Sequence, residues 1–222
     1  MSSTVVAIDG PAGAGKSTVA RLLAREIGAS YINTGSLYRA LALAARRAGI
    51  DPADVPEEFL ACQHLEFRGE TLYLNGEDPG AALRTPECAE GASLISKQPR
   101  VREYLLGVQR SAAAEQWIVM EGRDIGTVIF PDAACKFFVT ASVEERARRR
   151  LAQQGEVTEG ATLESVMAEI ARRDERDANR AVAPLRPAAD AEIVDTTGMT
   201  IAEVVARLAA EVRPAMEALR RG

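Results

Sequence analysis

Residues 10–17 read GPAGAGKS and fit the phosphate-binding pattern G-x-x-x-x-G-K-[ST] at every position. The segment follows an apolar run at 5–8 and precedes a helical pattern at 16–27. A loop in this place directs successive backbone N–H groups at one anion, and its glycines permit the sharp turn. The motif in this context predicts an α/β fold with a nucleoside triphosphate site.

The residues of this loop have expected parts in that site. Lys16 is expected to reach the β- and γ-phosphates and to act in catalysis, and the Ser17 hydroxyl is expected to ligate Mg²⁺. None of the three lysines lies in an Asn-Lys-x-Asp segment, with which GTPases read guanine. The predicted cofactors are therefore ATP and Mg²⁺. The predicted donor site comprises Gly10, Pro11, Ala12, Gly13, Ala14, Gly15, Lys16, Ser17 and Thr18.

Short apolar runs alternate with longer helical patterns along the rest of the chain. This alternation predicts a parallel five-stranded sheet covered by helices on both faces. A chain of 222 residues suits one domain with small insertions, so residues 1–222 are predicted to form a single domain. Strands are predicted at 5–8, 31–32, 117–120, 137–139 and 193–194, and helices at 16–27, 36–48, 142–153, 162–181 and 200–219.

Two segments interrupt this alternation. Residues 65–68 and 71–74 alternate apolar and polar side chains around Gly69-Glu70, which is typical of a hairpin. We therefore expect a small antiparallel insertion over 63–95. Residues 153–161 contain two glycines and few apolar side chains, and we expect them to form a mobile flap.

Composition excludes several other classes of protein. No stretch approaches the ~18 apolar residues needed to span a bilayer, and the first residues lack a signal-peptide pattern, so a cytoplasmic location without membrane contact is expected. Cys62, Cys88 and Cys135 are widely spaced and His64 is the single histidine, which argues against a disulfide framework and a soft metal site. The net charge of −5 argues against nucleic-acid binding. Nothing requires more than a monomer.

A charged stripe on the predicted helix 162–181 indicates a second site. Leu163, Val166 and Ile170 form an apolar stripe, and the same spacing continues through Arg173, Asp177 and Arg180. Because unpaired charges are costly to bury, either this helix end is solvated or its charges meet an anionic ligand. The pattern alone leaves both alternatives open.

Three further arginines favour the ligand. Arg39 lies on the first turns of one predicted helix, and Arg102 follows Pro99 on another. Arg123 lies just beyond the buried strand that ends at Met120. Ligands of α/β sheets bind outside the carboxyl ends of the strands. Together these arginines suggest a second phosphate pocket.

Four segments carry a resemblance to a known family. They are residues 8–18, 34–39 (TGSLYR), 121–127 with 130–132, and 172–184 (RRDERDANRAVAP). In these segments, and over almost its whole length, the chain resembles the bacterial cytidylate kinases. The resemblance implies a P-loop kinase that transfers the γ-phosphoryl group of ATP to CMP or dCMP in pyrimidine nucleotide metabolism. It also makes residues 63–95 the nucleoside monophosphate (NMP)-binding insertion and residues 151–165 a lid.

The resemblance further implies roles for individual residues. Arg39, Arg123 and Arg180 would hold the acceptor phosphate, and Asp177 with Arg173 would face the ribose. Cytosine presents an amino donor beside two acceptors, so it calls for an oxygen acceptor and an arginine donor. The residues implied around the base are Thr34, Ser93, Arg102 and Glu121. The residues implied in catalysis are Lys16, Arg123, Arg148, Arg176 and Arg180.

Two departures and two alternatives accompany this interpretation. Some relatives have aspartate at the position of Glu121 and glycine at that of Ser17, so the base contact and direct Mg²⁺ ligation can differ. One alternative is a kinase for another small acceptor, such as UMP or shikimate. The other is a nucleotide-dependent switch, which gives no reason for the charged stripe.

Overall fold

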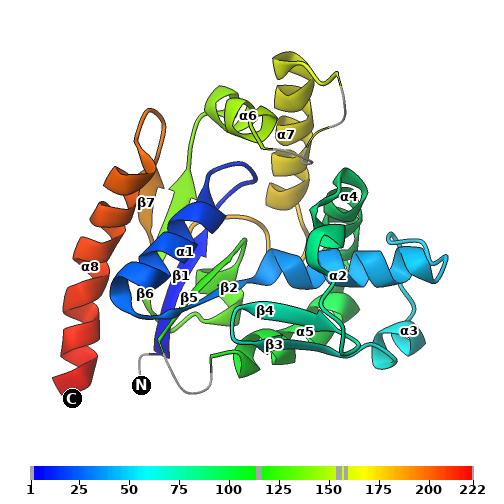
Figure 1. The fold of residues 1–222 in the computed structure, drawn as a ribbon, viewed down its shortest axis with the longest axis horizontal. Coiled ribbons are helices and arrows are strands. Elements are labelled where there is room, and N and C mark those ends of the chain that lie inside the picture. The colour runs from blue at the N-terminus through cyan, green and yellow to red at the C-terminus, as the bar shows by residue number, and fades with distance from the viewer. Residues whose placement is uncertain (1–2, 114–116, 154–156, 158–159, 222) are drawn as a thin grey trace.

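A parallel five-stranded sheet forms the centre of the computed structural model, which describes residues 3–113, 117–153, 157 and 160–221 (Figure 1). The strand order is β2-β5-β1-β6-β7, and every neighbouring pair is parallel. Both the sheet and the α/β class are as predicted. The strands are β1 (Ser3–Asp9), β2 (Ser30–Asn33), β5 (Ile118–Gly122), β6 (Ala133–Thr140) and β7 (Glu192–Asp195).

Alternate side chains of β1 enter different cores. Val6 and Ile8 pack with α1 (Lys16–Ile27) and α8 (Ile201–Arg221) on one face of the sheet. Val5 and Ala7 pack on the other face, where the short π-helix η2 (Ile125–Ile129) lies. Because successive side chains of a strand point to opposite faces, a strand apolar at every position is buried on both.

The predicted hairpin is present and belongs to a larger unit. Strands β3 (Leu65–Arg68) and β4 (Thr71–Leu74) pair antiparallel, with Leu65 opposite Leu74. Their apolar side chains share a core with helices on both sides of the expected insertion 63–95. This core joins the hairpin to α2 (Thr34–Arg47), α3 (Glu57–Ala61), α4 (Pro86–Ile95) and α5 (Pro99–Ser111), beside the 3-10 turn η1 (Gly80–Arg84).

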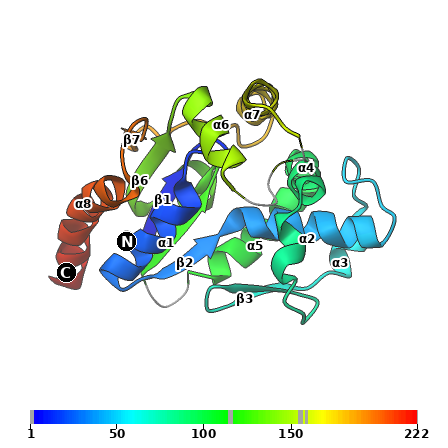
Figure 2. The same cartoon turned by 45° about the horizontal axis from the view of Figure 1, so that its top comes forward.

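Two helices lie beyond the carboxyl ends of the strands, α6 (Val143–Leu151) and α7 (Leu163–Ala178). They pack on each other through Ala147, Val166 and Ile170. Figures 1 and 2 both show α7 between α6 and α4. Within the predicted flap 153–161 and lid 151–165, residues 154–156 and 158–159 lie outside the described residues. No helix of the described chain is long and apolar enough to cross a bilayer.

Candidate functional site

The loop between β1 and α1 has a backbone that only glycine allows at key positions. Gly10, Gly13 and Gly15 have φ values of 146°, 75° and 84°. A Cβ added to Gly10 would lie 2.0 Å from the carbonyl oxygen of Val139 in β6. The turn and its close approach to the neighbouring strand therefore both require glycine.

Lys16 is buried at the first position of α1. Its Nζ donates a hydrogen bond to the carbonyl oxygen of Pro11 at 2.7 Å. Burial, followed by repulsion from Arg123, lowers the pKa of Lys16 to about 7. A bound anion would favour the charged ammonium, so this side chain suits a polyphosphate ligand.

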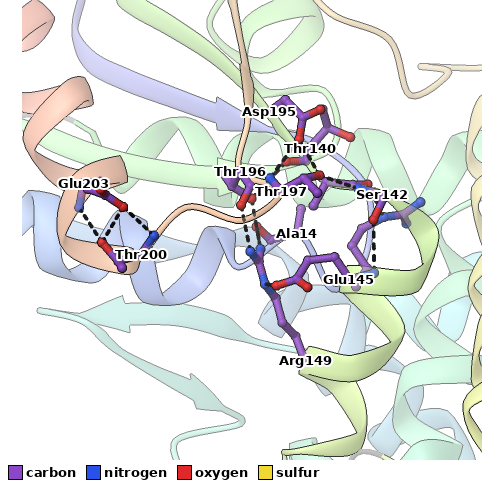
Figure 3. A network of polar contacts seen from close by, with 12 residues as sticks. Ala14, Thr140, Ser142, Glu145, Arg149, Asp195, Thr196, Thr197, Thr200 and Glu203 are labelled. Carbon is purple, nitrogen blue, oxygen red and sulfur yellow. Dashed lines mark hydrogen bonds and ion pairs between the residues drawn. The ribbon is translucent and has the colours of Figure 1, made fainter.

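Two arginines of α6 hold the phosphate-binding loop from outside. Arg146 donates to the carbonyl oxygen of Ala12 at 3.1 Å and pairs with Asp174 at 2.7 Å. Arg149 donates to the carbonyl oxygen of Ala14 at 3.3 Å (Figure 3). Both bonds are accepted by loop carbonyl oxygens, so they use none of the loop's N–H groups. The N–H groups are the groups of the loop that can bind an anion.

Arg149 also connects this loop to the segment after β7. Its guanidinium donates to the hydroxyl and the carbonyl oxygen of Thr196, each at 2.9 Å, and pairs with Glu145 at 2.9 Å (Figure 3). The hydroxyl of Thr197 accepts a hydrogen bond from the Ser142 amide at 2.9 Å. The donor side of the site is thus a braced assembly of three segments.

Arg148, expected among the catalytic arginines, lies on the opposite side of α6. Its side chain is 63% exposed and pairs with Glu144 at 2.5 Å, one turn earlier. The buried face of α6 follows helical spacing through Arg146, Ala147 and Arg150. That spacing is visible in the sequence and could have identified Arg146, which the sequence interpretation missed.

Asp177 and its arginines form the acceptor cluster, which we define as Arg123, Arg173, Asp177 and Arg180. Arg123 Nε lies 3.0 Å from Asp177 Oδ2, and Arg180 forms an ion pair with the other oxygen. Only 1% of the Asp177 side chain is exposed, and 6% of that of Arg180. This burial rules out a solvated helix end, so the alternative with an anionic ligand is favoured.

The acceptor cluster carries more positive than negative charge. Burial alone would raise the pKa of Asp177, but the guanidinium groups of Arg123, Arg180 and Arg173 hold it below its usual value. Burial, then repulsion from Arg123, lowers the pKa of Arg173 to about 10. The Nε atoms of Arg173 and Arg180 are buried without a hydrogen-bond partner among the described residues. Three cations around one carboxylate leave a place for an anion.

Arg39 lies on the same side of the molecule and adds to the field at Arg173, whose pKa it lowers further. One of its nitrogen atoms donates to the carbonyl oxygen of Leu83 at 2.8 Å, which ties α2 to the turn η1. Arg176, in contrast, pairs with Glu90 of α4 at 2.6 Å and 3.1 Å. In this structure Arg176 therefore connects α7 to α4 and does not join Lys16.

A buried ion pair lies beside the acceptor cluster. Arg102 of α5 pairs with Asp124, and its guanidinium lies 5.9 Å from the ring centre of Tyr38. Burial raises the pKa of Asp124. The buried Ser93 hydroxyl has no hydrogen-bond partner in the described chain. Oxygen acceptors and arginine donors are thus both present in this region. Asp124 was missed from the sequence, although it directly follows Arg123 in a segment that carries the family resemblance.

Glu121 and Thr34 occupy a different position. The Thr34 hydroxyl donates to the backbone oxygen of Glu121 at 2.8 Å, and the Glu121 carboxylate accepts from the Tyr31 hydroxyl at 2.6 Å. Val119, two residues earlier in β5, packs in the core that contains α1. By strand alternation the Glu121 carboxylate points to that same face. The structure therefore does not bring it to Arg102.

Comparisons with known proteins identify the family of this chain. The family profile described as cytidylate kinase matches residues 6–214. A cytidylate kinase of Pelotomaculum thermopropionicum is 47% identical, covering 93% of this chain and 95% of the relative. One from Mycobacterium leprae is 49% identical, covering 94% and 95%.

Solved structures of lower identity show the fold. A shikimate kinase from Bacteroides thetaiotaomicron has a TM-score of 0.50 at 14% identity and covers 94% of this chain and 98% of its own. A gluconokinase from Sinorhizobium meliloti 1021 has the same TM-score and identity and covers 98% and 97%. With the family profile spanning nearly all of the sequence and relatives this similar, the chain belongs to the cytidylate kinase family.

Proposed function

We propose that this protein transfers the γ-phosphoryl group of ATP to the 5′-phosphate of CMP or dCMP, giving ADP and CDP or dCDP. One observation carries the proposal. A triphosphate-type loop with a buried lysine lies at the end of β1, and a buried cluster rich in arginine lies at the end of the adjacent β5. Two anion sites on neighbouring parallel strands suit transfer between two phosphates.

The proposed mechanism relies on positioning and charge. The attacking phosphate oxygen of CMP is already anionic, so the reaction needs no strong general base. Lys16 would neutralise charge on the donor, while Arg123, Arg180 and Arg39 would hold the acceptor phosphate in line with it. Arg173 and Asp177 would face the ribose, where the carboxylate accepts from a hydroxyl.

For the base, we propose a pocket made by Arg102, Asp124 and Ser93. The carboxylate would accept from the cytosine amino group, and Arg102 would donate to the ring acceptors. Uracil carries a carbonyl at position 4, which leaves that acceptor unpaired and disfavours UMP. We place Thr34 and Glu121 behind the acceptor site, where their mutual hydrogen bond connects α2 to β5.

Mg²⁺ fits the donor side of this proposal. Ser17 is exposed at the second position of α1, so its hydroxyl is accessible beside the phosphate-binding loop. A hydroxyl together with phosphate oxygens is the hard oxygen donor set that Mg²⁺ prefers. When bound, the ion neutralises charge that develops on the transferred phosphoryl group.

The remaining parts of the proposal concern the surroundings. Residues 151–165 would act as a lid that excludes water from the reacting phosphates. The three cysteines, Cys62, Cys88 and Cys135, are all free, which suits a reducing cytoplasm. We propose that the protein acts as a monomer on small substrates, without nucleic acid or membrane partners.

An acceptor panel tests the function directly. ADP formation from ATP·Mg²⁺ is measured with CMP, dCMP, UMP, AMP or no acceptor, for the natural protein and for Lys16→Ala. Lys97→Ala serves as the matched control because Lys97 is an exposed lysine outside both pockets. We expect strong stimulation by CMP and dCMP, weak stimulation by UMP, and loss of about 10²- to 10³-fold in Lys16→Ala alone. Hydrolysis that ignores the acceptor, or preference for another monophosphate, would contradict the proposal.

A further inference from the structure

Asp9, the last residue of β1, has a buried carboxylate with a specific pair of partners. Its Oδ1 accepts the amide N–H of Ile125 at 2.8 Å, and its Oδ2 accepts that of Gly126 at 2.8 Å. These two amides begin the π-helix η2, where the first N–H groups have no partner within the turn. A single carboxylate from another strand therefore satisfies both donors.

The segment held by Asp9 carries acceptor-site residues. Asp124, which pairs with Arg102, and Arg123, which pairs with Asp177, immediately precede the two bound amides. The carbonyl oxygen of Asp124 accepts from the amides of Val128 and Ile129, which fixes the other side of the turn. The backbone from 123 to 126 is thus clamped between β1 and its own turn.

Gly126 packs close to the side chains of Lys136 and Asp9. A Cβ added to Gly126 would lie 3.5 Å from Asp9 Oδ2 and 3.1 Å from Lys136 Cδ. The pKa of Asp9 is raised to about 6, chiefly because the carboxyl group is buried. The hydrogen bonds from the two amides oppose this rise, and the smaller effects of Asp124 and Lys16 have opposite signs. Asp9 directly precedes Gly10, so the same residue lies at the start of the donor loop.

We propose that Asp9 is a positioning residue for the site that binds the base of the acceptor nucleotide. Its two oxygen atoms hold the Ile125 and Gly126 amides and thereby fix the positions of Asp124 and Arg123. The expected effect on CMP binding rests on the proposed function, whereas the contact itself rests on the two hydrogen bonds of Asp9. Only a carboxylate offers two oxygen acceptors of this size. An asparagine offers one oxygen and turns an N–H₂ group toward the second amide.

The test uses Asp9→Asn, with Asp51→Asn as the matched control. Asp51 also accepts one backbone N–H, that of Ala53 at 2.8 Å, but in an exposed loop outside both pockets. Two readouts are compared: amide hydrogen exchange over residues 123–130 without substrate, and kcat and KM for CMP and UMP at saturating ATP. The first readout depends on the contact alone, and the second depends on the function as well.

In Asp9→Asn we expect faster exchange over 123–130, a CMP KM raised about tenfold, and a similar loss of preference for CMP over UMP. The KM for ATP should change by less than about threefold. Asp51→Asn should change neither readout. Asp9→Ala is the second variant; it removes both acceptor oxygens, so it should move both readouts in the same direction and at least as far.

Unchanged exchange in folded Asp9→Asn and Asp9→Ala would overturn the positioning role. Faster exchange with an unchanged CMP KM and unchanged base preference would overturn its link to the acceptor. If the natural protein does not use CMP, the proposed function fails, and the exchange readout still decides whether Asp9 holds this segment.

Discussion

The donor and acceptor sides of this molecule are built in different ways. The donor side is one continuous loop whose ligand-facing groups are backbone N–H groups, braced by Arg146 and Arg149. The acceptor side is a set of charged side chains from separate elements, with Arg102 on α5, Arg123 after β5 and Asp177 on α7. On the donor side, glycines determine the shape of the backbone that faces the ligand. On the acceptor side, buried charged side chains determine the electrostatics of the site.

The two sides should therefore differ in the substitutions that damage them. A backbone site loses little when one neighbouring surface side chain is removed, because its donors belong to the main chain. A side-chain cluster depends on each member, because the loss of one charge leaves its buried partner uncompensated. The acceptor side should therefore respond more strongly to single arginine substitutions than the outer face of the donor side.

Among the arginine substitutions, the largest expected effect is on the acceptor side. Arg123→Ala removes a guanidinium group whose Nε lies 3.0 Å from Asp177. The charge of this same group lowers the pKa of Lys16 in the natural protein. We expect kcat with CMP to fall by about 10²-fold, since a cation near the transferred group is lost. Steady-state kinetics with CMP measure this, and Arg172→Ala, an exposed arginine of α7, is the control. Near-normal turnover in folded Arg123→Ala would contradict the expectation that the acceptor side depends on each buried charge.

An intermediate effect concerns pH on the donor side. Lys16 has a pKa of about 7 without ligand, so it is charged below that pH and loses its proton above it. Triphosphate binding favours the charged form, so above about pH 7 binding must take up a proton and the Kd for ATP should rise by up to about tenfold per pH unit. Below about pH 7 the Kd should be flat.

Calorimetry in buffers of different ionisation enthalpy measures this uptake as a function of pH. Lys16→Arg is the control, because its guanidinium stays charged throughout. A Kd and a proton uptake that do not change across pH 7 in the natural protein would contradict the lowered pKa of Lys16.

The smallest expected effect is at Arg148. Because its side chain is exposed and pairs with Glu144 one turn earlier on the same helix, Arg148→Ala should change kcat by less than about twofold. Arg149→Ala removes the contacts to Ala14 and Thr196 and should weaken ATP binding more. ATP affinity measured in parallel for both variants separates the outer face of α6 from the face that holds the loop. A larger loss in Arg148→Ala would place that side chain in the closed lid.

Much of the fold was predictable because its signals are local. The apolar runs of the five strands and the hairpin pattern around Gly69-Glu70 each depend on adjacent residues, and the structure has both. The predicted helix 162–181 was too long, since α7 ends at Ala178. The chain then turns, so that the Leu185 amide donates to the carbonyl oxygen of Asp177.

The candidate site was predictable only in part. The arginines 123, 173 and 180 could be grouped from strand ends and helical spacing, and the structure brings them together around Asp177. Arg146 and Asp124 were missed because their importance depends on contacts with residues distant in sequence, Ala12 and Arg102. Helical and strand periodicity indicate a face, but they do not say what that face meets.

The sequence alone predicts the donor site, because its glycines, its lysine and its helix N-terminus are adjacent in the chain. Tertiary structure decided the rest. It buries the charged end of α7, which argues against a solvated helix end and favours an anionic ligand there. It also decided which carboxylate meets Arg102, because alternation along β5 sends Glu121 toward Tyr31 while the turn held by Asp9 brings Asp124 to α5.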